Sequence, residues 1–224
     1  MPAKLRRRSF VQQCTSCHAP YRLHSRCTNR NREIMTTNWD QRYQNGDVPW
    51  SLDVPSPALI GYIEQLIDVH AKVLIPGAGI GHEALYLIQK GFSDVTILDI
   101  SPTAIKILEE RWGHPEGLNL VTGDFFTHES QYDLILEQTF FCAIDRVQRE
   151  AYVQKMHQLL LPQGKIAGVL FASEFEKEGP PHGGCHQEYF DLFSKFFKIN
   201  TMEPCYNSIS PRLGNELFFI CQKL

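Results

Sequence analysis

Short apolar runs alternate with segments of helical periodicity along most of this chain. Seven strand-like runs occur, at 72–76, 94–100, 118–124, 132–138, 165–173, 197–204 and 215–224. Between several of them, apolar residues recur at the spacing of an amphipathic helix, in 82–92, 101–112, 145–160 and 186–197. This alternation predicts an α/β fold with a doubly wound, mostly parallel, seven-stranded sheet. The last two runs predict a terminal strand pair.

Residues that favour helix ends support these boundaries. Ser101 followed by Pro102 is a strong start signal, because the Ser hydroxyl can accept from a free amide and Pro needs no amide partner there. Gly91 suits the C-terminus of helix 82–92. The Pro-Gln-Gly segment 162–164 is expected to end helix 145–160.

Three glycines follow the first predicted strand at every second position. Gly77, Gly79 and Gly81 lie where an open α/β sheet binds its ligand, between the first strand and the first helix. A dinucleotide fingerprint would need glycine at position 82, which is His82, so the pattern is G-x-G-x-G. No Gly-Lys-Ser/Thr follows, which excludes a P-loop. Asp99 ends the second strand, where an acid can accept hydrogen bonds from both ribose hydroxyls. The loop and Asp99 suit either NAD or S-adenosylmethionine.

The ends of the next two strands favour the second of these cofactors. Asp124 and Phe125 close the third strand and offer a carboxylate and an apolar face to an adenine ring. Gln138 closes the fourth strand beside the same crevice. Taken together and in this order, these features are the layout of a class I S-adenosylmethionine-dependent methyltransferase, and they disfavour an oxidoreductase.

Composition and charge restrict the partners. With 43% hydrophobic residues the chain is expected to be globular, and no apolar run approaches the length of a membrane span. Residues 1–34 carry eight Lys/Arg and one acid, whereas the remainder carries 14 basic and 24 acidic residues. An acidic body disfavours nucleic-acid binding through a broad basic face. The four scattered cysteines of the remainder suit reduced thiols in the cytoplasm.

The basic segment 1–34 differs from the rest and is expected to be a disordered extension of a single domain, residues 35–224. Alternatives for it are a transit peptide, a start of translation at Met35, and a c-type haem attachment at its C-x-x-C-H motif. A further alternative is a zinc knuckle built from Cys14, Cys17, Cys27 and either His18 or His24. We expect no metal in the main domain.

Several longer motifs carry a family resemblance, from Trp39 to the C-terminus. They include WDQRYQNGDVPW, VLIPGAGIGHE, GDFF, YDLILEQTFFCAI and GPPHGG. The chain resembles the thiopurine S-methyltransferase family, and especially its thiocyanate/halide/thiol methyltransferase branch. The resemblance implies that an N-terminal lid segment with Trp39, Tyr43 and Trp50 closes over S-adenosylmethionine. It also implies cofactor contacts at Gly77, Asp99, Asp124 and Phe125. Gln138 stands where relatives have Tyr or Arg.

The expected acceptor is a small thiol, a thiopurine or a soft anion such as thiocyanate or halide. Such nucleophiles need little activation, so no catalytic triad is expected. His182 is a candidate base, with His82 and Glu137 less direct, although its ring could simply line the pocket. Arg146 and Arg149 are expected to be solvated helix charges. The expected acceptor site comprises Phe140, Phe141, Pro180, Pro181 and His182.

Two alternatives stay open for the function. The first is an O- or N-methyltransferase of another small metabolite, and the second is a catalytically silent binding module with the same fold. In each case we expect a monomer.

Overall fold

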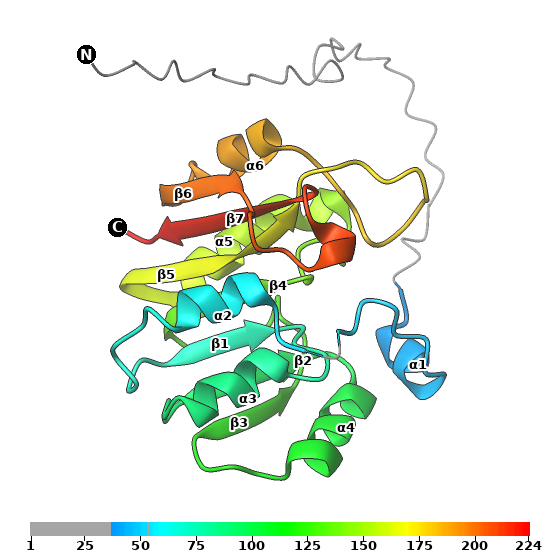
Figure 1. The fold of residues 1–224 in the computed structure, drawn as a ribbon, viewed down its shortest axis with the longest axis vertical. Helices are drawn as coiled ribbons and strands as arrows, with labels where there is room; N and C mark the ends of the chain where they lie inside the picture. The colour runs from blue at the N-terminus through cyan, green and yellow to red at the C-terminus, as the bar shows by residue number, and fades with distance from the viewer. Residues whose placement is uncertain (1–36, 53) are drawn as a thin grey trace, which may run out of the picture. The chain divides into compact units, whose positions relative to one another are not determined.

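A seven-stranded sheet forms the centre of the computed structural model, which describes residues 37–52 and 54–224. The strand order is β3-β2-β1-β4-β5-β7-β6 (Figure 1). The pairs from β3 to β5 are parallel, and β7 runs antiparallel between β5 and β6. The strands are β1 (Val73–Pro76), β2 (Val95–Asp99), β3 (Leu118–Thr122), β4 (Tyr132–Gln138), β5 (Leu160–Phe171), β6 (Lys198–Pro204) and β7 (Glu216–Gln222). The predicted mostly parallel sheet and terminal strand pair are confirmed.

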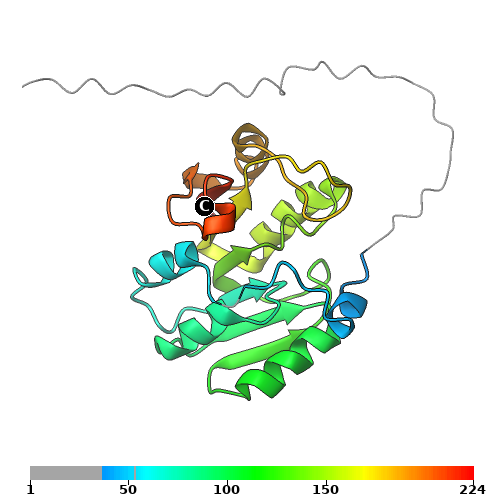
Figure 2. The same ribbon diagram turned by 45° about the vertical axis from the view of Figure 1, so that its right-hand side comes forward.

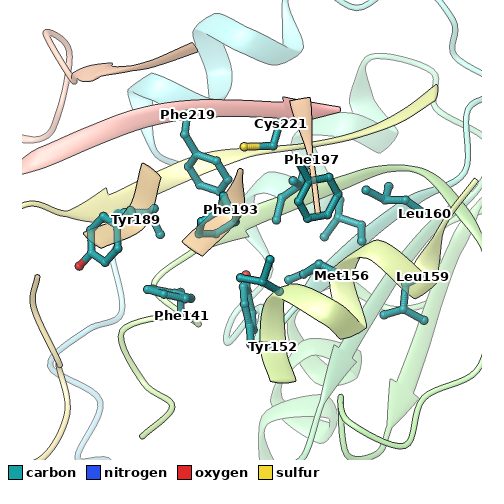
Figure 3. Packing of buried hydrophobic residues seen from close by; sticks show 14 of the residues in the cluster. Phe141, Tyr152, Met156, Leu159, Leu160, Tyr189, Phe193, Phe197, Phe219 and Cys221 are labelled. Carbon is teal, nitrogen blue, oxygen red and sulfur yellow. The ribbon is translucent and has the colours of Figure 1, made fainter. Parts of the chain in front are cut away.

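Helices cover both faces of this sheet, as a doubly wound fold requires. They are α1 (Trp39–Gln44), α2 (Pro57–Ile63), α3 (His82–Gln89), α4 (Pro102–Trp112), α5 (Arg149–Leu159) and α6 (His186–Phe193), with 3-10 turns η1 (Arg146–Gln148) and η2 (Ser210–Arg212). Side chains of β1 alternate between two cores. Val73 and Ile75 pack with α2, α3 and α4, while Leu74 packs with α5 and α6. Figure 3 shows the second of these cores, rich in aromatic rings.

Both predicted helix-end signals around α3 and α4 are confirmed. Ser101 Oγ accepts a hydrogen bond from the Ala104 amide at 3.0 Å, which caps α4. Gly91 has φ +91° just beyond α3, a conformation that glycine adopts without the strain of a Cβ.

Helix α5 ends within one residue of its predicted bound, but it begins at Arg149, after the 3-10 turn η1. It stops at Leu159 and β5 begins at once with Leu160, so the segment 162–164 lies inside the strand. Leu160 is fully buried and pairs with Tyr132, with a register shift before the regular β4–β5 pairing. The pairing passes from Tyr132–Leu160 to Leu134–Lys165, and Gln163 has φ +65°, so residues 161–164 form a bulge within β5. The Pro-Gln-Gly segment thus turns the chain locally without ending the strand.

Helices α1 and α2 were not predicted, and both are short. Asn38 caps α1, where its side chain accepts from the Gln41 amide at 3.0 Å. In α2, Pro57 starts the helix and Leu59 and Ile63 are fully buried. Figures 1 and 2 show α1 beside the N-terminal end of α4, far from it in sequence.

No helix among the described residues is long and apolar enough to span a membrane. The basic segment 1–34, including Cys14, Cys17, His18, His24 and Cys27, lies outside the described residues.

Candidate active site

The glycine loop lies at the point where the strand order reverses, because β1 is flanked by β2 on one side and β4 on the other. Gly77, Gly79 and Gly81 have φ of +58°, +56° and +65°. A Cβ on Gly77 would lie 2.5 Å from the Phe140 ring, and one on Gly79 would lie 3.0 Å from the Tyr43 hydroxyl. The loop therefore needs glycine both for its backbone and for its close neighbours.

Asp99 is fixed against this loop at the end of β2. Its Oδ1 accepts from the Ser101 amide at 2.9 Å, and its Oδ2 accepts from the Gly79 amide at 3.4 Å. The side chain is buried, and this burial raises the pKa of Asp99, while the backbone donors oppose the shift. Each oxygen keeps acceptor capacity for a further donor.

A carboxylate of the N-terminal lid segment binds the start of helix α4. Asp40 of α1 accepts from the Ser101 hydroxyl at 2.6 Å and from the Thr103 amide at 2.9 Å, at the N-terminus of α4. These hydrogen bonds lower the pKa of Asp40. The sequence did not predict this contact, which holds α1 beside the glycine loop.

The expected aromatic trio comes together as one cluster. The ring of Trp50 lies 5.2 Å from that of Trp39 and 5.8 Å from that of Tyr43, and its Nε1 donates to the Tyr43 hydroxyl at 3.3 Å. Burial, with the Asp99 charge, raises the pKa of Tyr43 to about 12, so the phenol stays neutral. The guanidinium of Arg42 lies 4.2 Å from the Trp50 ring centre, so one face of that ring already contacts a cation.

A first cavity of about 470 Å³, part of it open to solvent, lies beside the glycine loop. Its lining brings together four residues predicted for the cofactor, Trp50, Gly77, Gly79 and Gln138. His82 also lines it, with its Nε2 2.9 Å from the Leu52 carbonyl oxygen.

The side chain of Gln138 shows whether the first cavity suits a cofactor. Its Oε1 is buried and has no hydrogen-bond donor among the described residues. A buried acceptor without a partner is costly, and a ligand that donates to it would remove that cost. The amino group of S-adenosylmethionine is such a donor, so the residues present fit the cofactor.

The remaining predicted cofactor residues lie differently. Asp124 is exposed after β3, and its Oδ1 accepts from the Phe126 amide at 2.9 Å. Phe125 is 4% exposed, and its ring packs against Phe140 and Tyr152 in the core. Five of the nine residues predicted for the cofactor are therefore not part of the first cavity's lining: Trp39, Tyr43, Asp99, Asp124 and Phe125. The half-buried Phe126, the second Phe of the GDFF motif, is more accessible than Phe125.

Glu137 is fully buried and organises the turn after β4. Its Oε1 accepts from the Phe140 and Phe141 amides at 2.8 and 2.9 Å, and Tyr152 donates its hydroxyl to Oε2. Burial raises the pKa of Glu137 to about 7. The turn it holds includes Thr139, which has φ +60°, a strained conformation for a β-branched residue.

A second, smaller cavity opens on the other side of Thr139. It is lined by Thr139, Phe141, Cys142, Val169, Leu170, Phe171, Tyr189 and Glu216. Thr139 belongs to the linings of both cavities. Of the predicted acceptor residues, Phe141 lines this cavity, although it is only 1% exposed, whereas Phe140, Pro180, Pro181 and His182 do not.

His182 is partly buried beside this region. Its amide donates to the Cys142 carbonyl at 2.7 Å, and burial lowers the pKa of its imidazole, with Asp145 opposing the shift. A neutral imidazole at neutral pH is compatible either with a base or with a packing ring.

Arg149 is not a solvated charge, and that expectation was wrong. The residue is 3% exposed and donates to Glu188 at 2.5 Å and to the Gly183 carbonyl at 2.8 Å. Its guanidinium lies 4.7 Å from the Phe141 ring centre. The α5 sequence alone does not show that the segment around Gly183 returns over this helix. Arg146 is half-exposed and pairs with Glu174, as a surface charge does.

Comparison with known proteins identifies the class. The sequence model for the family described as Thiopurine S-methyltransferase (TPMT) matches residues 34–217. The chain belongs to this family and is an S-adenosylmethionine-dependent methyltransferase of small molecules, so the predicted fold, cofactor and reaction class are confirmed.

Individual relatives agree with this assignment. The chain is 28% identical over 190 residues to probable thiol methyltransferase 2 of Arabidopsis thaliana, covering 82% of this chain and 84% of that protein. It is 28% identical over 184 residues to thiocyanate methyltransferase 1 of Brassica oleracea, covering 80% and 81%. Among solved structures, the 1,6-didemethyltoxoflavin-N1-methyltransferase of Burkholderia thailandensis, with bound S-adenosylhomocysteine, aligns with TM-score 0.63 at 21% identity, covering 82% and 84%. That structural likeness supports the fold.

Proposed function

We propose that the enzyme transfers a methyl group from S-adenosylmethionine in the first cavity to the sulfur of a small acceptor in the second. The observation that carries this proposal is the position of Thr139, which borders both cavities. A methyl group passing between them would cross at this residue. The names of the thiol and thiocyanate methyltransferases among the relatives support sulfur as the receiving atom.

The chain's residues bind and orient the cofactor, which supplies an already activated methyl group. Asp99 accepts from the ribose hydroxyls and Gln138 Oε1 accepts from the amino group of the methionine part. The carboxylate of Asp124 would accept from the adenine amine, and Phe125 would support the adenine region through its packing against Phe140. Trp39, Tyr43 and Trp50 would present aromatic surface to the sulfonium, with Arg42 already over one face of Trp50. Gly77 and Gly79 let the backbone approach the ligand.

The second cavity favours a small, soft acceptor. Most of its lining is apolar, and its enclosed part has room for about one water molecule. Any thiol would require this cavity to widen, but a thiol of few atoms requires much less widening than a fused-ring purine. Phe141 forms its wall, and Phe140, Pro181 and His182 contact the acceptor only if the nearby loops adjust on binding.

The surface charge and the free thiols bear on the partners and the cellular compartment of the enzyme. Residues 35–224 are strongly acidic, which disfavours nucleic acid as a partner. Cys142, Cys205 and Cys221 are buried free thiols, as suits a cytoplasmic protein. We infer a monomer whose partner is the small-molecule acceptor.

A methyl-transfer panel tests this function. The purified enzyme is incubated with S-adenosylmethionine and, in parallel, with small thiols, thiocyanate, iodide, phenols and amines. Methylated sulfur products at rates well above those for phenols and amines are expected. Products on oxygen or nitrogen alone would assign the enzyme to another acceptor class. Cofactor binding without any product would point to a silent binding module.

A further inference from the structure

Glu216 places a carboxylate in the wall of the second cavity. It is the first residue of β7, it pairs with Phe171 of β5, and it is 5% exposed. Its backbone oxygen accepts from the Cys205 amide at 2.8 Å, which fixes the strand start. A buried carboxylate in an otherwise apolar cavity is costly unless it has a partner or a task.

Its charged partner is Arg212, which does not line the cavity. Arg212 Nη1 lies 3.6 Å from Glu216 Oε1, with the two side chains 12% and 5% exposed. The same guanidinium donates to the Trp50 carbonyl at 3.3 Å and lies 5.5 Å from the Phe171 ring centre. Arg212 is not part of the cavity lining, whereas Glu216 is. Glu216 therefore contributes the carboxylate of the pair to the cavity wall, while Arg212 lies just outside the lining.

The other titratable side chains of the lining, the Cys142 thiol and the Tyr189 phenol, are neutral, and two guanidiniums lie just outside it. Arg149 is 4.7 Å from the Phe141 ring centre and Arg212 is 5.5 Å from the Phe171 ring centre. Burial raises the pKa of the Cys142 thiol to about 12 and raises that of the Tyr189 phenol as well. The Tyr189 hydroxyl already donates to the Phe171 carbonyl at 2.7 Å. Burial also raises the pKa of Glu216, and the nearby Ser208 hydroxyl and the charge of Arg212 oppose this shift. Among the residues of this lining, the carboxylate alone can receive a proton from an acceptor near neutral pH.

We propose that Glu216 makes the enzyme select a neutral, hydrogen-donating thiol over a small anion, and that it takes the thiol proton during transfer. The inference rests on sulfur methylation as proposed above and adds the charge state of the acceptor. A thiocyanate or halide ion in this cavity would face the carboxylate in a medium of low dielectric, where like charges repel strongly. A thiol would instead donate a hydrogen bond to it.

The proton balance of the step is simple. The S–H bond of the thiol breaks and its proton passes to a carboxylate oxygen of Glu216. The thiol sulfur forms the new bond to the methyl carbon, while the bond between that carbon and the sulfonium breaks and leaves its electron pair on the departing sulfur. The proton leaves Glu216 for solvent after the thioether product departs.

The variant Glu216→Gln tests the proposal. The matched control is Glu203→Gln, at an exposed position of β6. Binding is titrated into the enzyme saturated with S-adenosylhomocysteine, which cannot donate methyl, using 2-mercaptoethanol and thiocyanate as probes. We expect Glu216→Gln to weaken thiol binding and strengthen thiocyanate binding, shifting their affinity ratio by about tenfold or more. In turnover, kcat/KM for the thiol should also lose its decline at low pH.

An unchanged affinity ratio and pH profile in Glu216→Gln would overturn the proposal. A wild-type titration in buffers of different ionisation enthalpy covers the case in which the variant fails to fold. We expect the thiol to bind in its neutral form, so that no net proton is released to the buffer. Release of one proton to the buffer per bound thiol would mean that the thiolate binds, and it would contradict the proposal. The wild-type acceptor panel separately decides sulfur methylation, because it compares sulfur with oxygen and nitrogen acceptors and does not depend on Glu216.

Discussion

The buried carboxylate of Glu137 should make the folded enzyme less stable as pH rises through neutrality. The group has no exposed surface, and its pKa is raised from 4.5 to about 7 in the folded protein. The folded state therefore holds a proton that the unfolded state has already lost between these two pH values. The favourable contribution is complete below pH 4.5 and is lost as pH rises through 7.

The size of this effect follows from the shift. A difference of about 2.5 pKa units corresponds to about 3 kcal/mol, most of it lost between pH 5 and 8. The variant Glu137→Gln has nearly the same shape. Its Oε1 can still accept from the Phe140 and Phe141 amides, and it carries no ionisable group. The stability difference between wild type and Glu137→Gln should therefore change by that amount over this pH range.

Chemical denaturation at pH 5, 6, 7 and 8 measures the difference. Glu129→Gln, an exposed position before β4, serves as the control and should follow wild type at every pH. A stability difference between wild type and Glu137→Gln that does not change with pH would mean that Glu137 titrates like an exposed carboxyl. In that case the argument that burial sets its charge would be refuted.

Two further substitutions test the loop and the cavity. Gly77→Ala and Gly113→Ala both place Ala at positive φ, but only Gly77 faces a ring, that of Phe140 at 2.5 Å, while Gly113 has open space. Thermal unfolding should show that Gly77→Ala costs about 1–3 kcal/mol more than Gly113→Ala, and equal losses would argue against tight packing of the loop. Gln138→Leu removes the unpartnered Oε1, so the ligand-free enzyme should gain about 1 kcal/mol of unfolding free energy while its S-adenosylmethionine affinity falls. If calorimetry shows unchanged affinity, Gln138 does not bind the cofactor.

Much of the fold could be predicted because its signals are local. Ser101 and Pro102 start α4 through contacts within one turn, and β4 has the predicted bounds. The two missed helices, α1 and α2, are six and seven residues long. Helices of this length are marginal by themselves and depend on tertiary contacts. For α1, one such contact is Asp40 on α4.

The site was predictable where topology alone brings residues together. Trp50, Gly77, Gly79 and Gln138 share a cavity. For the loop and the strand end this follows because the carboxyl ends of parallel strands meet at one edge. Glu216 and Arg149 could not be found in this way. The first lines the second cavity from the antiparallel strand β7, and the second is covered by the segment around Gly183. No periodicity along the chain reports such distant contacts.

The central claim is that Asp99 and the glycine loop bind S-adenosylmethionine, and calorimetric titration tests it most directly. The proteins are wild type, Asp99→Ala, and Asp94→Ala as a control just before the opposite end of β2. S-adenosylmethionine should bind wild type and the control alike, NAD should not bind, and Asp99→Ala should lose about 1–3 kcal/mol of binding free energy. Equal S-adenosylmethionine affinity in wild type and Asp99→Ala, or no binding by wild type, would contradict the account.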